Sequence, residues 1–252
     1  MIDLTGKKVL VTGGSRGIGC ATSLLFAEAG CDVAINYAHK DGPAKSVKAQ
    51  IEQLGRNCLI LKADVSKIND VERMVRQIFE KWNGIDIVVN NAGIWTYGEM
   101  GDMDESTWKE TMGINLDGVF YVCNAIVHEM KAGNGGVIII VSSTAGIRGE
   151  AFHSHYAASK GALISFTKSL AQELAPYRIR VNCVTPGWVD TDMCADILSD
   201  PAFRKDVEES IPLKRISNPV DIAGPILFLA SDLARHITGE ILNVNGGSVL
   251  CG

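Results

Sequence analysis

Tyr156 and Lys160 lie four residues apart in the stretch HSHYAASKGAL, residues 153–163. On a helix, residues at i and i+4 share one face, so this spacing brings an ammonium close to a phenol. A free tyrosine has a pKa of about 10 and is a poor base at neutral pH, and a nearby positive charge lowers that pKa. The pair could therefore pass a proton to or from a substrate oxygen.

The tyrosine–lysine spacing carries little weight by itself. With five tyrosines and fourteen lysines in 252 residues, chance gives roughly 0.3 such pairs. Only Tyr156 has a lysine four positions on. The alternative is an ordinary amphipathic helix, so the interpretation depends on the elements that would position the pair.

Short β-branched runs alternate with segments of helical periodicity along the chain. We predict strands at 7–14, 32–37, 57–65, 85–93, 136–143, 179–187 and 239–247. These runs are apolar on both faces, which is typical of a parallel sheet covered by helices on each side. The pattern predicts one Rossmann-type doubly wound α/β domain over residues 1–252, with a seven-stranded parallel sheet. Residues 190–217 interrupt the alternation and are predicted to be a helical insertion, a substrate lid.

The composition excludes several classes of protein. The chain is 46% hydrophobic and 21% charged with a net charge of −5, which suits a globular core and makes nucleic acid an unexpected partner. We find no apolar run of the ~20 residues that a membrane span needs, and we expect no secretory leader. The seven cysteines are odd in number and form no C-x-x-C, and the histidines are scattered. We therefore expect a cytoplasmic protein without a metal site.

A glycine-rich turn follows the first predicted strand and opens the first predicted helix. In VLVTGGSRGIGCA, Gly13, Gly17 and Gly19 allow a tight turn and a close backbone approach. The exposed N–H groups at a helix start favour an anion. A turn that merely needs small residues is the alternative, but the position between strand and helix favours a dinucleotide phosphate.

The order of motifs resembles the classical short-chain dehydrogenase/reductase family over nearly the whole chain. The matching motifs are TGGSRGIG at 12–19, DV at 64–65, NNAG at 90–93, IN at 114–115, SS at 142–143, Y-x-x-x-K at 156–160 and PG at 186–187. The C-terminal half, with IPLKRISNPVDIAGPILFLASD and ITGEILNVNGG, is most similar to bacterial 3-oxoacyl-[acyl-carrier-protein] reductases. Each motif is weak alone, and the ordered set is specific.

The resemblance implies a catalytic set of Asn115, Ser143, Tyr156 and Lys160. Tyr156 would exchange the proton, and Lys160 would favour the phenolate and contact the nicotinamide ribose. Ser143 lies thirteen residues before Tyr156 and would donate a hydrogen bond to the substrate oxygen. Ser142 is the rival, and the alternation of side chains along a strand lets only one of the two face the site. Asn115 would hold a water in a proton relay with the lysine.

The resemblance also implies the residues that contact the cofactor. By motif they are Gly13, Ser15, Arg16, Gly17, Ile18, Gly19, Tyr37, His39, Asp64, Val65, Asn91, Ala92, Gly93, Tyr156, Lys160, Pro186, Gly187, Val189 and Thr191. A carboxylate at the end of the second strand would bind the ribose hydroxyls of NAD. Tyr37 stands there instead, with Arg16 in the glycine turn, which favours NADP(H) over NAD(H), although Asp41 lies nearby.

The substrate is predicted to be a ketone or secondary alcohol, first of all a 3-oxoacyl thioester. Related reductases meet the acidic carrier protein with two arginines, at positions that hold Asn134 and Tyr177 here, and Lys131 and Arg178 lie close by. The alternative is a dehydrogenase of sugars, polyols or small alcohols. The predicted pocket walls are Trp95, Phe152, His153, Trp188 and Met193.

Two further expectations concern assembly and a rival class. The helix after Tyr156 carries small residues at Ala158, Ala162, Ser165 and Ser169, which would let another helix approach closely. Together with the resemblance they predict a homotetramer. A cofactor-binding regulator without turnover would be favoured by loss of Tyr156 or Lys160, and both are present.

Overall fold

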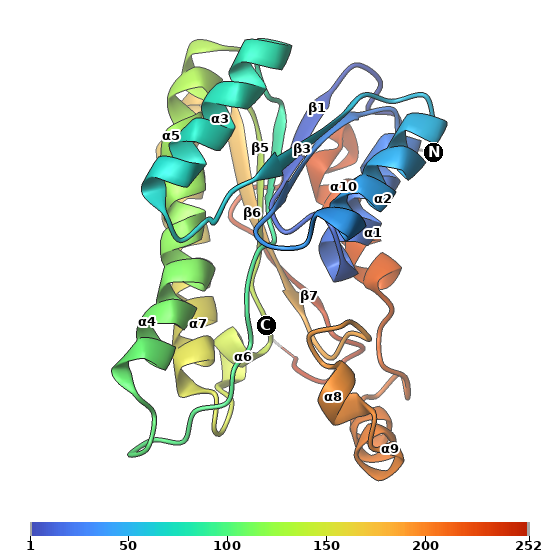
Figure 1. The fold of residues 1–252 in the computed structure, drawn as a ribbon, viewed down its shortest axis with the longest axis vertical. Helices are drawn as coiled ribbons and strands as arrows, with labels where there is room; N and C mark the ends of the chain where they lie inside the picture. The colour runs from blue at the N-terminus through green and yellow to red at the C-terminus, as the bar shows by residue number, and fades with distance from the viewer. Residues whose placement is uncertain (1, 251–252) are drawn as a thin grey trace.

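Seven parallel strands form one sheet in the computed structural model, which describes residues 2–250 (Figure 1). The strand order is β3-β2-β1-β4-β5-β6-β7. Their bounds are β1 Lys8–Val11, β2 Asp32–Tyr37, β3 Cys58–Lys62, β4 Ile87–Asn90, β5 Gly136–Val141, β6 Ile179–Pro186 and β7 Ile241–Val244. The predicted seven-stranded parallel sheet is confirmed.

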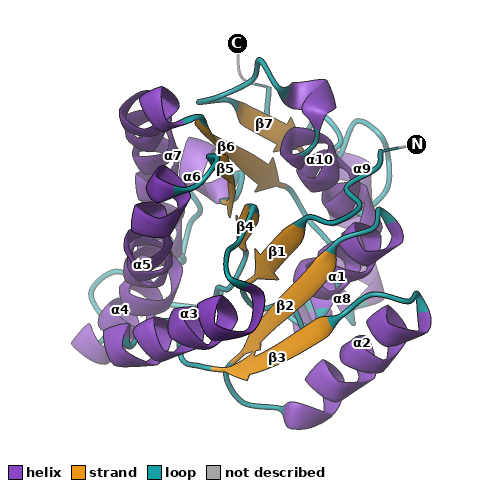
Figure 2. Cartoon of the chain, turned by 90° about the horizontal axis from the view of Figure 1, so that it is seen from above, coloured by secondary structure: helices purple, strands orange, loops and turns teal. Residues whose placement is uncertain are grey.

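Helices cover both faces of the sheet (Figure 2). One face carries α1 Gly17–Glu28, α2 Asp41–Gln53 and α10 Pro219–Ala230, and the other carries α3 Ile68–Trp82, α5 Gly118–Ala132 and α7 Ser154–Leu174. The shorter helices are α4 Glu105–Met112, α6 Ala145–Arg148, α8 Ala195–Leu198 and α9 Pro201–Ser210. A π-helical turn, Gly113–Asp117, joins α4 to α5, and single 3-10 turns lie at Ala175–Tyr177 and Asp232–Ala234. None of the helices between residues 2 and 250 combines the length and apolar character that a membrane span requires.

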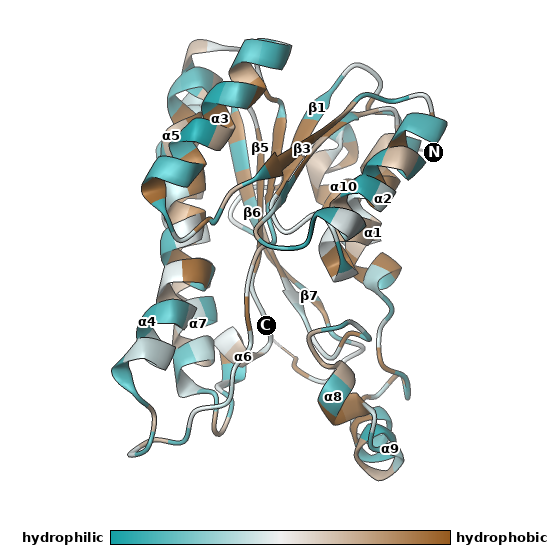
Figure 3. Cartoon of the chain, viewed as in Figure 1, coloured by the Kyte–Doolittle hydropathy of each residue, from teal (hydrophilic) through white to brown (hydrophobic). Residues whose placement is uncertain are grey.

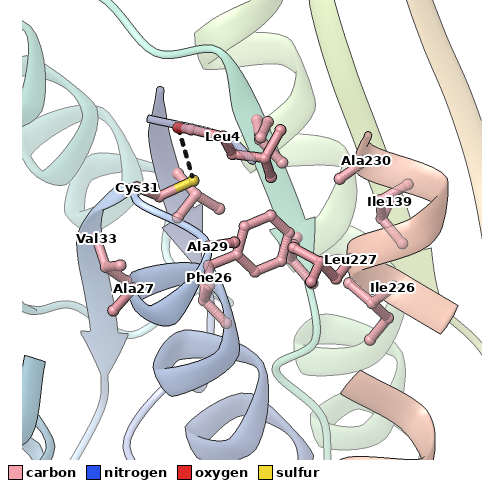
Figure 4. Packing of buried hydrophobic residues seen from close by; sticks show 14 of the residues in the cluster. Leu4, Phe26, Ala27, Ala29, Cys31, Val33, Ile139, Ile226, Leu227 and Ala230 are labelled. Carbon is pink, nitrogen blue, oxygen red and sulfur yellow. Dashed lines mark hydrogen bonds between the residues drawn. The ribbon is translucent and has the colours of Figure 1, made fainter. Parts of the chain in front are cut away.

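The strand side chains divide between two apolar cores. In β1, Val9 and Val11 point to the core under α1 and α10, whereas Leu10 points to the core under α3, α5 and α7. On the first face, Phe26 of α1 and Leu227 of α10 are buried in the same cluster (Figure 4). Apart from Lys8 at the start of β1 and Asn90 at the end of β4, the strands β1, β4 and β5 consist of apolar residues and glycine. Polar residues lie on the outer helix surfaces (Figure 3). Because both faces of β1, β4 and β5 are buried, the sequences of these strands are continuous hydrophobic runs and do not alternate between apolar and polar residues.

The direction of strand addition reverses beside β1. The chain builds outward from β1 to β2 and β3, then crosses back to place β4 on the other side of β1. The carboxyl ends of β1 and β4 therefore lie side by side. Open α/β sheets bind ligands in the crevice outside such a reversal point.

The segment between β6 and α10 carries α8 and α9, as the helical insertion predicted at 190–217 requires. It has a small apolar core of its own, formed by Leu198, Val207, Ile211 and Ile216. The Arg204 guanidinium donates to Asp190 at 2.7 Å, which ties α9 to the residues after β6. In Figure 1 the two helices project beyond the end of the sheet. Their role as a lid stays a prediction.

Replacement of Gly19 by alanine tests the packing between the glycine turn and α1. A Cβ at Gly19 would lie 2.2 Å from the Gly13 carbonyl oxygen and 2.6 Å from Nδ2 of Asn91. Because backbone cannot yield cheaply, we expect Gly19→Ala to lower the free energy of unfolding by about 1 to 3 kcal/mol. Denaturant unfolding measures this loss.

Gly42→Ala is the matched control. Gly42 lies in α2, and a Cβ there would meet nothing within 4 Å. We expect this variant to match or exceed the wild-type stability. Equal stability of Gly19→Ala and Gly42→Ala would contradict the tight packing.

Candidate active site

A cleft of about 760 Å³ runs along the carboxyl ends of the strands. Its wall is built by the glycine turn, the ends of β2, β4, β5 and β6, the first turns of α7 and the start of the 190–217 segment. Every residue predicted to contact the cofactor lies on this wall except Gly19. The strand topology thus brings together motifs that are spread over nearly the whole sequence.

Gly19 is the exception among the predicted cofactor contacts. It does not line the cleft, and its missing side chain instead lets α1 pack against the Gly13 carbonyl and Asn91. The Asn91 amide donates to the Thr12 carbonyl at 2.9 Å, and the Asn91 backbone N–H donates to the Thr12 hydroxyl at 2.9 Å. These bonds fasten the end of β4 to the glycine turn.

The glycine turn fits a phosphate group. Gly13 and Gly17 have φ angles of +63° and +52°, a conformation that glycine adopts without strain. Helix α1 begins after Arg16 with no side-chain cap and no acidic residue in its first turn. Its N-terminal N–H groups are therefore left for an anion, which is stabilised by the positive end of the helix dipole.

The far end of the cleft is basic. Arg16, His39 and Lys40 line it, together with the ring of Tyr37 at the end of β2. Asp41 does not line it, and its carboxylate lies 3.1 Å from Lys62. Arg16 has one acidic neighbour in the described residues, Asp192 at 3.9 Å, and both side chains are exposed.

At the other end of the cleft, Tyr156 and Lys160 lie in the first two turns of α7. The Lys160 Nζ atom lies 5.8 Å from the centre of the Tyr156 ring. The Lys160 ammonium is buried and donates to the Val141 carbonyl at 2.9 Å. The backbone carbonyl of Lys160 accepts from the Ser142 hydroxyl at 2.7 Å. The lysine therefore joins α7 to the end of β5.

Burial changes the proton affinity of both groups. It lowers the pKa of Lys160 to about 8, because the ammonium loses hydration. It also raises the pKa of Tyr156, while the Ser143 hydroxyl acts in the opposite direction. Desolvation of the phenolate thus dominates the Tyr156 pKa in the chain alone. The lowering of this pKa by Lys160 together with an oxidised nicotinamide stays a prediction.

The structure separates the two neighbouring serines. Strand β5 ends at Val141, so both lie just beyond it rather than within it. Ser142 is buried, with its hydroxyl turned to the backbone of α7, whereas the Ser143 hydroxyl faces the Tyr156 phenol. Ser143 is thus the serine in a position to reach a substrate oxygen.

Asn115 lies in the π-helical turn, fully buried and behind the cleft wall. Its side-chain oxygen accepts from the Ile94 N–H at 2.8 Å, and its amide donates to the Ile94 carbonyl at 2.9 Å. A Cβ at Gly93 would lie 3.2 Å from this oxygen and 3.4 Å from Nζ of Lys160. Because Gly93 has no side chain, Asn115 and Lys160 can both lie close to its backbone.

Aromatic rings form the wall beyond Tyr156. The Trp95 ring stacks on His153 with centroids 4.3 Å apart and planes 17° apart, and Trp188 meets Trp95 edge-on at 6.0 Å. Trp95, Trp188 and Met193 line the cleft as predicted, whereas Phe152 and His153 do not. The exposed Phe152 ring packs on Tyr97 instead, because its backbone turns outward with φ at +62°.

Several lining residues were missed by sequence reasoning, and three of them belong to the substrate end of the cleft. Arg148 and Glu150, in and after α6, and Cys194, just before α8, line the wall near Tyr156. They belong to no motif and sit in irregular segments, so nothing in their spacing indicated the site. Within the described residues, no three histidine, cysteine or acidic side chains gather as a metal site would require.

Comparison with known proteins decides the family. A family model described as enoyl-(acyl carrier protein) reductase matches residues 13–248. The chain is 41% identical over 245 residues to an L-rhamnose 1-dehydrogenase (NAD(P)(+)) of Sphingomonas sp. (strain SKA58), covering 97% of this chain and 96% of that protein. It is 38% identical over 244 residues to the 3-oxoacyl-[acyl-carrier-protein] reductase FabG of Chlamydia trachomatis, and the match covers 97% of this chain and 98% of that protein.

The chain belongs to the short-chain dehydrogenase/reductase family. A solved short-chain type dehydrogenase/reductase from Mycobacterium marinum has the same fold, with a TM-score of 0.93, 36% identity and coverage of 99% of this chain and 98% of that one. The family assignment makes the protein an oxidoreductase that acts on CH–OH groups with a nicotinamide cofactor. The resemblance drawn from the ordered motifs is confirmed at this level.

Proposed function

We propose that the protein interconverts a ketone and a secondary alcohol with NADP(H), and that Tyr156 exchanges the proton at the substrate oxygen. The observation that carries this proposal is the convergence of Tyr156, Ser143 and buried Lys160 at one end of a cleft whose other end fits a phosphate. The bound cofactor supplies or accepts the hydride. The protein groups orient the substrate and move the proton.

The proton chemistry follows from the site electrostatics. Ser143 would donate a hydrogen bond to the substrate oxygen and hold it against the Tyr156 phenol. Burial disfavours the phenolate of the free chain. A positive charge brought into the cleft favours that phenolate, so the tyrosine becomes a better base when an oxidised nicotinamide is bound. Tyr156 would then accept the alcohol proton during oxidation and donate it during reduction.

Lys160 and Asn115 would carry the proton onward. The Lys160 ammonium, with a pKa of about 8, is easily deprotonated near neutral pH and can accept or release a proton. Its position beside Gly93 and Asn115 supports a relay through a water held there. We also propose that Lys160 contacts the nicotinamide ribose.

The basic end of the cleft supports NADP(H) rather than NAD(H). A 2′-phosphate would meet Arg16, His39 and Lys40, and no carboxylate at the end of β2 would grip the free ribose hydroxyl. The Asp41 carboxylate is paired with Lys62 and also lies beside the Tyr37 hydroxyl, but it does not line the cleft. Arginine suits a phosphate because its planar fork can donate two hydrogen bonds.

A 3-oxoacyl thioester is one candidate substrate, and it rests on the C-terminal resemblance and on relatives that carry that activity in their names. Docking of an acidic carrier protein has weaker support. The Lys131 ammonium lies over the Tyr177 ring at 4.5 Å and reaches Glu173 at 4.0 Å. Lys131 and Arg178 are the two cations near Asn134 and Tyr177. The contacts with Tyr177 and Glu173 engage Lys131, so only Arg178 is left to meet a carrier protein.

A sugar or polyol is the second candidate substrate. It is favoured by the half-buried carboxylate of Glu150 in the cleft and by the wide indole face of Trp95. A relative named as an L-rhamnose 1-dehydrogenase supports the same class. The remote alternative of a regulator without turnover has no support, because the groups that would perform the chemistry are present.

Assembly as a homotetramer is proposed from the surface of α7. Ala158, Ser165 and Ser169 are exposed on this helix, and Phe120 of the neighbouring α5 is 47% exposed. Small residues beside an exposed aromatic ring suit close helix packing between subunits. Cytoplasmic location stays a prediction. The six cysteines of the described residues form no disulfide bond, which is consistent with a reducing compartment.

Removal of the Tyr156 hydroxyl tests the proton transfer. With the cleft shape kept, Tyr156→Phe should lower kcat on every substrate by at least about 100-fold, the scale of general acid–base catalysis. Binding of NADPH, followed by its fluorescence, should stay close to wild type. The panel comprises acetoacetyl-CoA, simple ketones and alcohols, and sugars, and Tyr121→Phe on α5 is the control. Wild-type turnover by Tyr156→Phe would overturn the assignment.

Cofactor preference tests the basic end of the cleft. We expect the wild type to have a higher kcat/KM with NADP(H) than with NAD(H). Loss of a charged hydrogen bond to phosphate in Arg16→Ser should reduce that preference by about 10-fold or more. Lys81→Ser, on the exposed end of α3, is the control. A clear preference of the wild type for NAD(H) would refute the cofactor proposal.

The molar mass in solution tests the assembly. Multi-angle light scattering should give about four times the chain mass of 27.1 kDa. Replacement of Ala158 by arginine on the exposed face of α7 should shift the mass to smaller species, because the larger charged side chain blocks close approach. A monomeric wild type would rule the tetramer out.

A further inference from the structure

The loop between α6 and α7 brings a carboxylate into the cleft. Glu150 is half-buried and lines the same wall as Tyr156. No ion pair of Glu150 is present among the described residues, although Arg148 lies two positions before it. The polar groups that act on its carboxyl are the His153 ring, the Trp95 indole N–H, which donates to it, and the Arg148 guanidinium. Glu150 therefore retains most of its capacity to accept hydrogen bonds.

The position of Glu150 is unfavourable for the protein alone. Burial raises the pKa of its carboxyl, which shows that the ionised form loses hydration without full compensation. Its negative charge also raises the pKa of Tyr156, which opposes the formation of a phenolate. A group that disturbs both its own ionisation and the neighbouring proton chemistry is typical of a ligand-binding site.

Two histidines fix the aromatic face beside Glu150. His153 Nδ1 bonds the Thr96 carbonyl at 2.7 Å while its ring stacks on Trp95. His155 is fully buried, and its Nε2 lies 2.8 Å from the Thr96 hydroxyl. Both histidines lie at the start of α7, and both contact Thr96, the residue after Trp95. The indole plane is set by the same helix that carries Tyr156.

A fixed indole face next to a carboxylate that has no ion pair matches one kind of molecule. A polyhydroxylated ring presents C–H groups on its faces, which pack on an aromatic plane, and hydroxyls at its edge, which donate to a carboxylate. An acyl chain would bury the carboxylate with no donor added to the Trp95 indole N–H, so most of the desolvation would stay uncompensated. The wall is therefore suited to a sugar or a cyclitol more than to an acyl thioester.

We propose that Glu150 is a specificity-determining residue that accepts hydrogen bonds from the hydroxyls of a polyhydroxylated ring stacked on Trp95. This inference rests on the proposed oxidoreductase function. The reacting carbon loses a hydride to NADP⁺ and its hydroxyl loses a proton to Tyr156, so an aldopyranose yields a lactone and a cyclitol yields a ketone. NADPH and one released proton complete the balance.

Matched ring substrates test this role. Oxidation by NADP⁺ is followed by NADPH absorbance with D-xylose, D-galactose, L-arabinose and myo-inositol, and with cyclohexanol as the ring without further hydroxyls. In the wild type, at least one polyhydroxylated ring should exceed cyclohexanol in kcat/KM by about 100-fold, because a buried acceptor left without its donor is costly. Glu150→Gln should reduce this ratio by about 10-fold or more, since the charged acceptor is lost.

Two further variants separate specificity from folding. Glu150→Leu should lower kcat/KM for the polyhydroxylated rings and raise it for cyclohexanol, a reversal that a folding defect cannot produce. Glu72→Gln, exposed on α3 outside the cleft, should leave the ratio at its wild-type value.

The outcomes distinguish the two levels of the proposal. An equal fall for both kinds of substrate in Glu150→Gln, or a wild type that prefers cyclohexanol or acetoacetyl-CoA to every polyhydroxylated ring, overturns the role of Glu150 alone. Absence of turnover on all of these substrates with either cofactor overturns the proposed function, and this inference with it.

Discussion

A buried ammonium joins the sheet to the helix that carries the reacting tyrosine. Lys160 donates to the last carbonyl of β5, and its own backbone carbonyl accepts from Ser142 just beyond that strand. A Cβ at Gly146 of α6 would lie 2.6 Å from the Lys160 backbone, so β5, α6 and α7 meet at one point. Because burying an ammonium is unfavourable without such a partner, the junction ties the geometry of the cleft to the position of a single side chain. Tyr156 and Ser143 are placed relative to each other through it.

The fold and the cofactor cleft could be predicted from sequence because both depend on local residue types. Apolar strands that end in Gly, Asn or Ser mark the carboxyl edge of a parallel sheet, and the order of the motifs places them at that edge. All the predicted cofactor contacts except Gly19 therefore lie on the cleft wall. Gly19 was assigned to the wall because the sequence pattern of a glycine turn does not distinguish a glycine that contacts a ligand from one that packs on a neighbouring backbone.

The substrate end of the cleft could not be predicted in the same way. Glu150 sits in an irregular loop, and no periodicity links it to Trp95, although the two meet in space. The outward turn of Phe152 depends on a left-handed backbone that aromatic residues rarely adopt. The contribution of burial to the Tyr156 pKa was out of reach for a related reason, since charge spacing is visible in a sequence but desolvation depends on packing. His153 and His155, two residues apart, act on one residue only because their helix starts beside Thr96.

The strand order also has a consequence for how the molecule forms. Neighbouring strands are never joined by a hairpin, and the central pair β1–β4 matches Val9 with Ile87. The bond from Asn91 to Thr12 likewise joins residues 79 positions apart. Pairing over such separations requires long loops to close and slows folding. The glycine turn is fixed by its hydrogen bonds to Asn91 only after the 79 positions that separate Thr12 from Asn91 have been synthesised. A ligand that recognises the completed turn would thus bind late in folding and stabilise the assembled sheet rather than an early fragment.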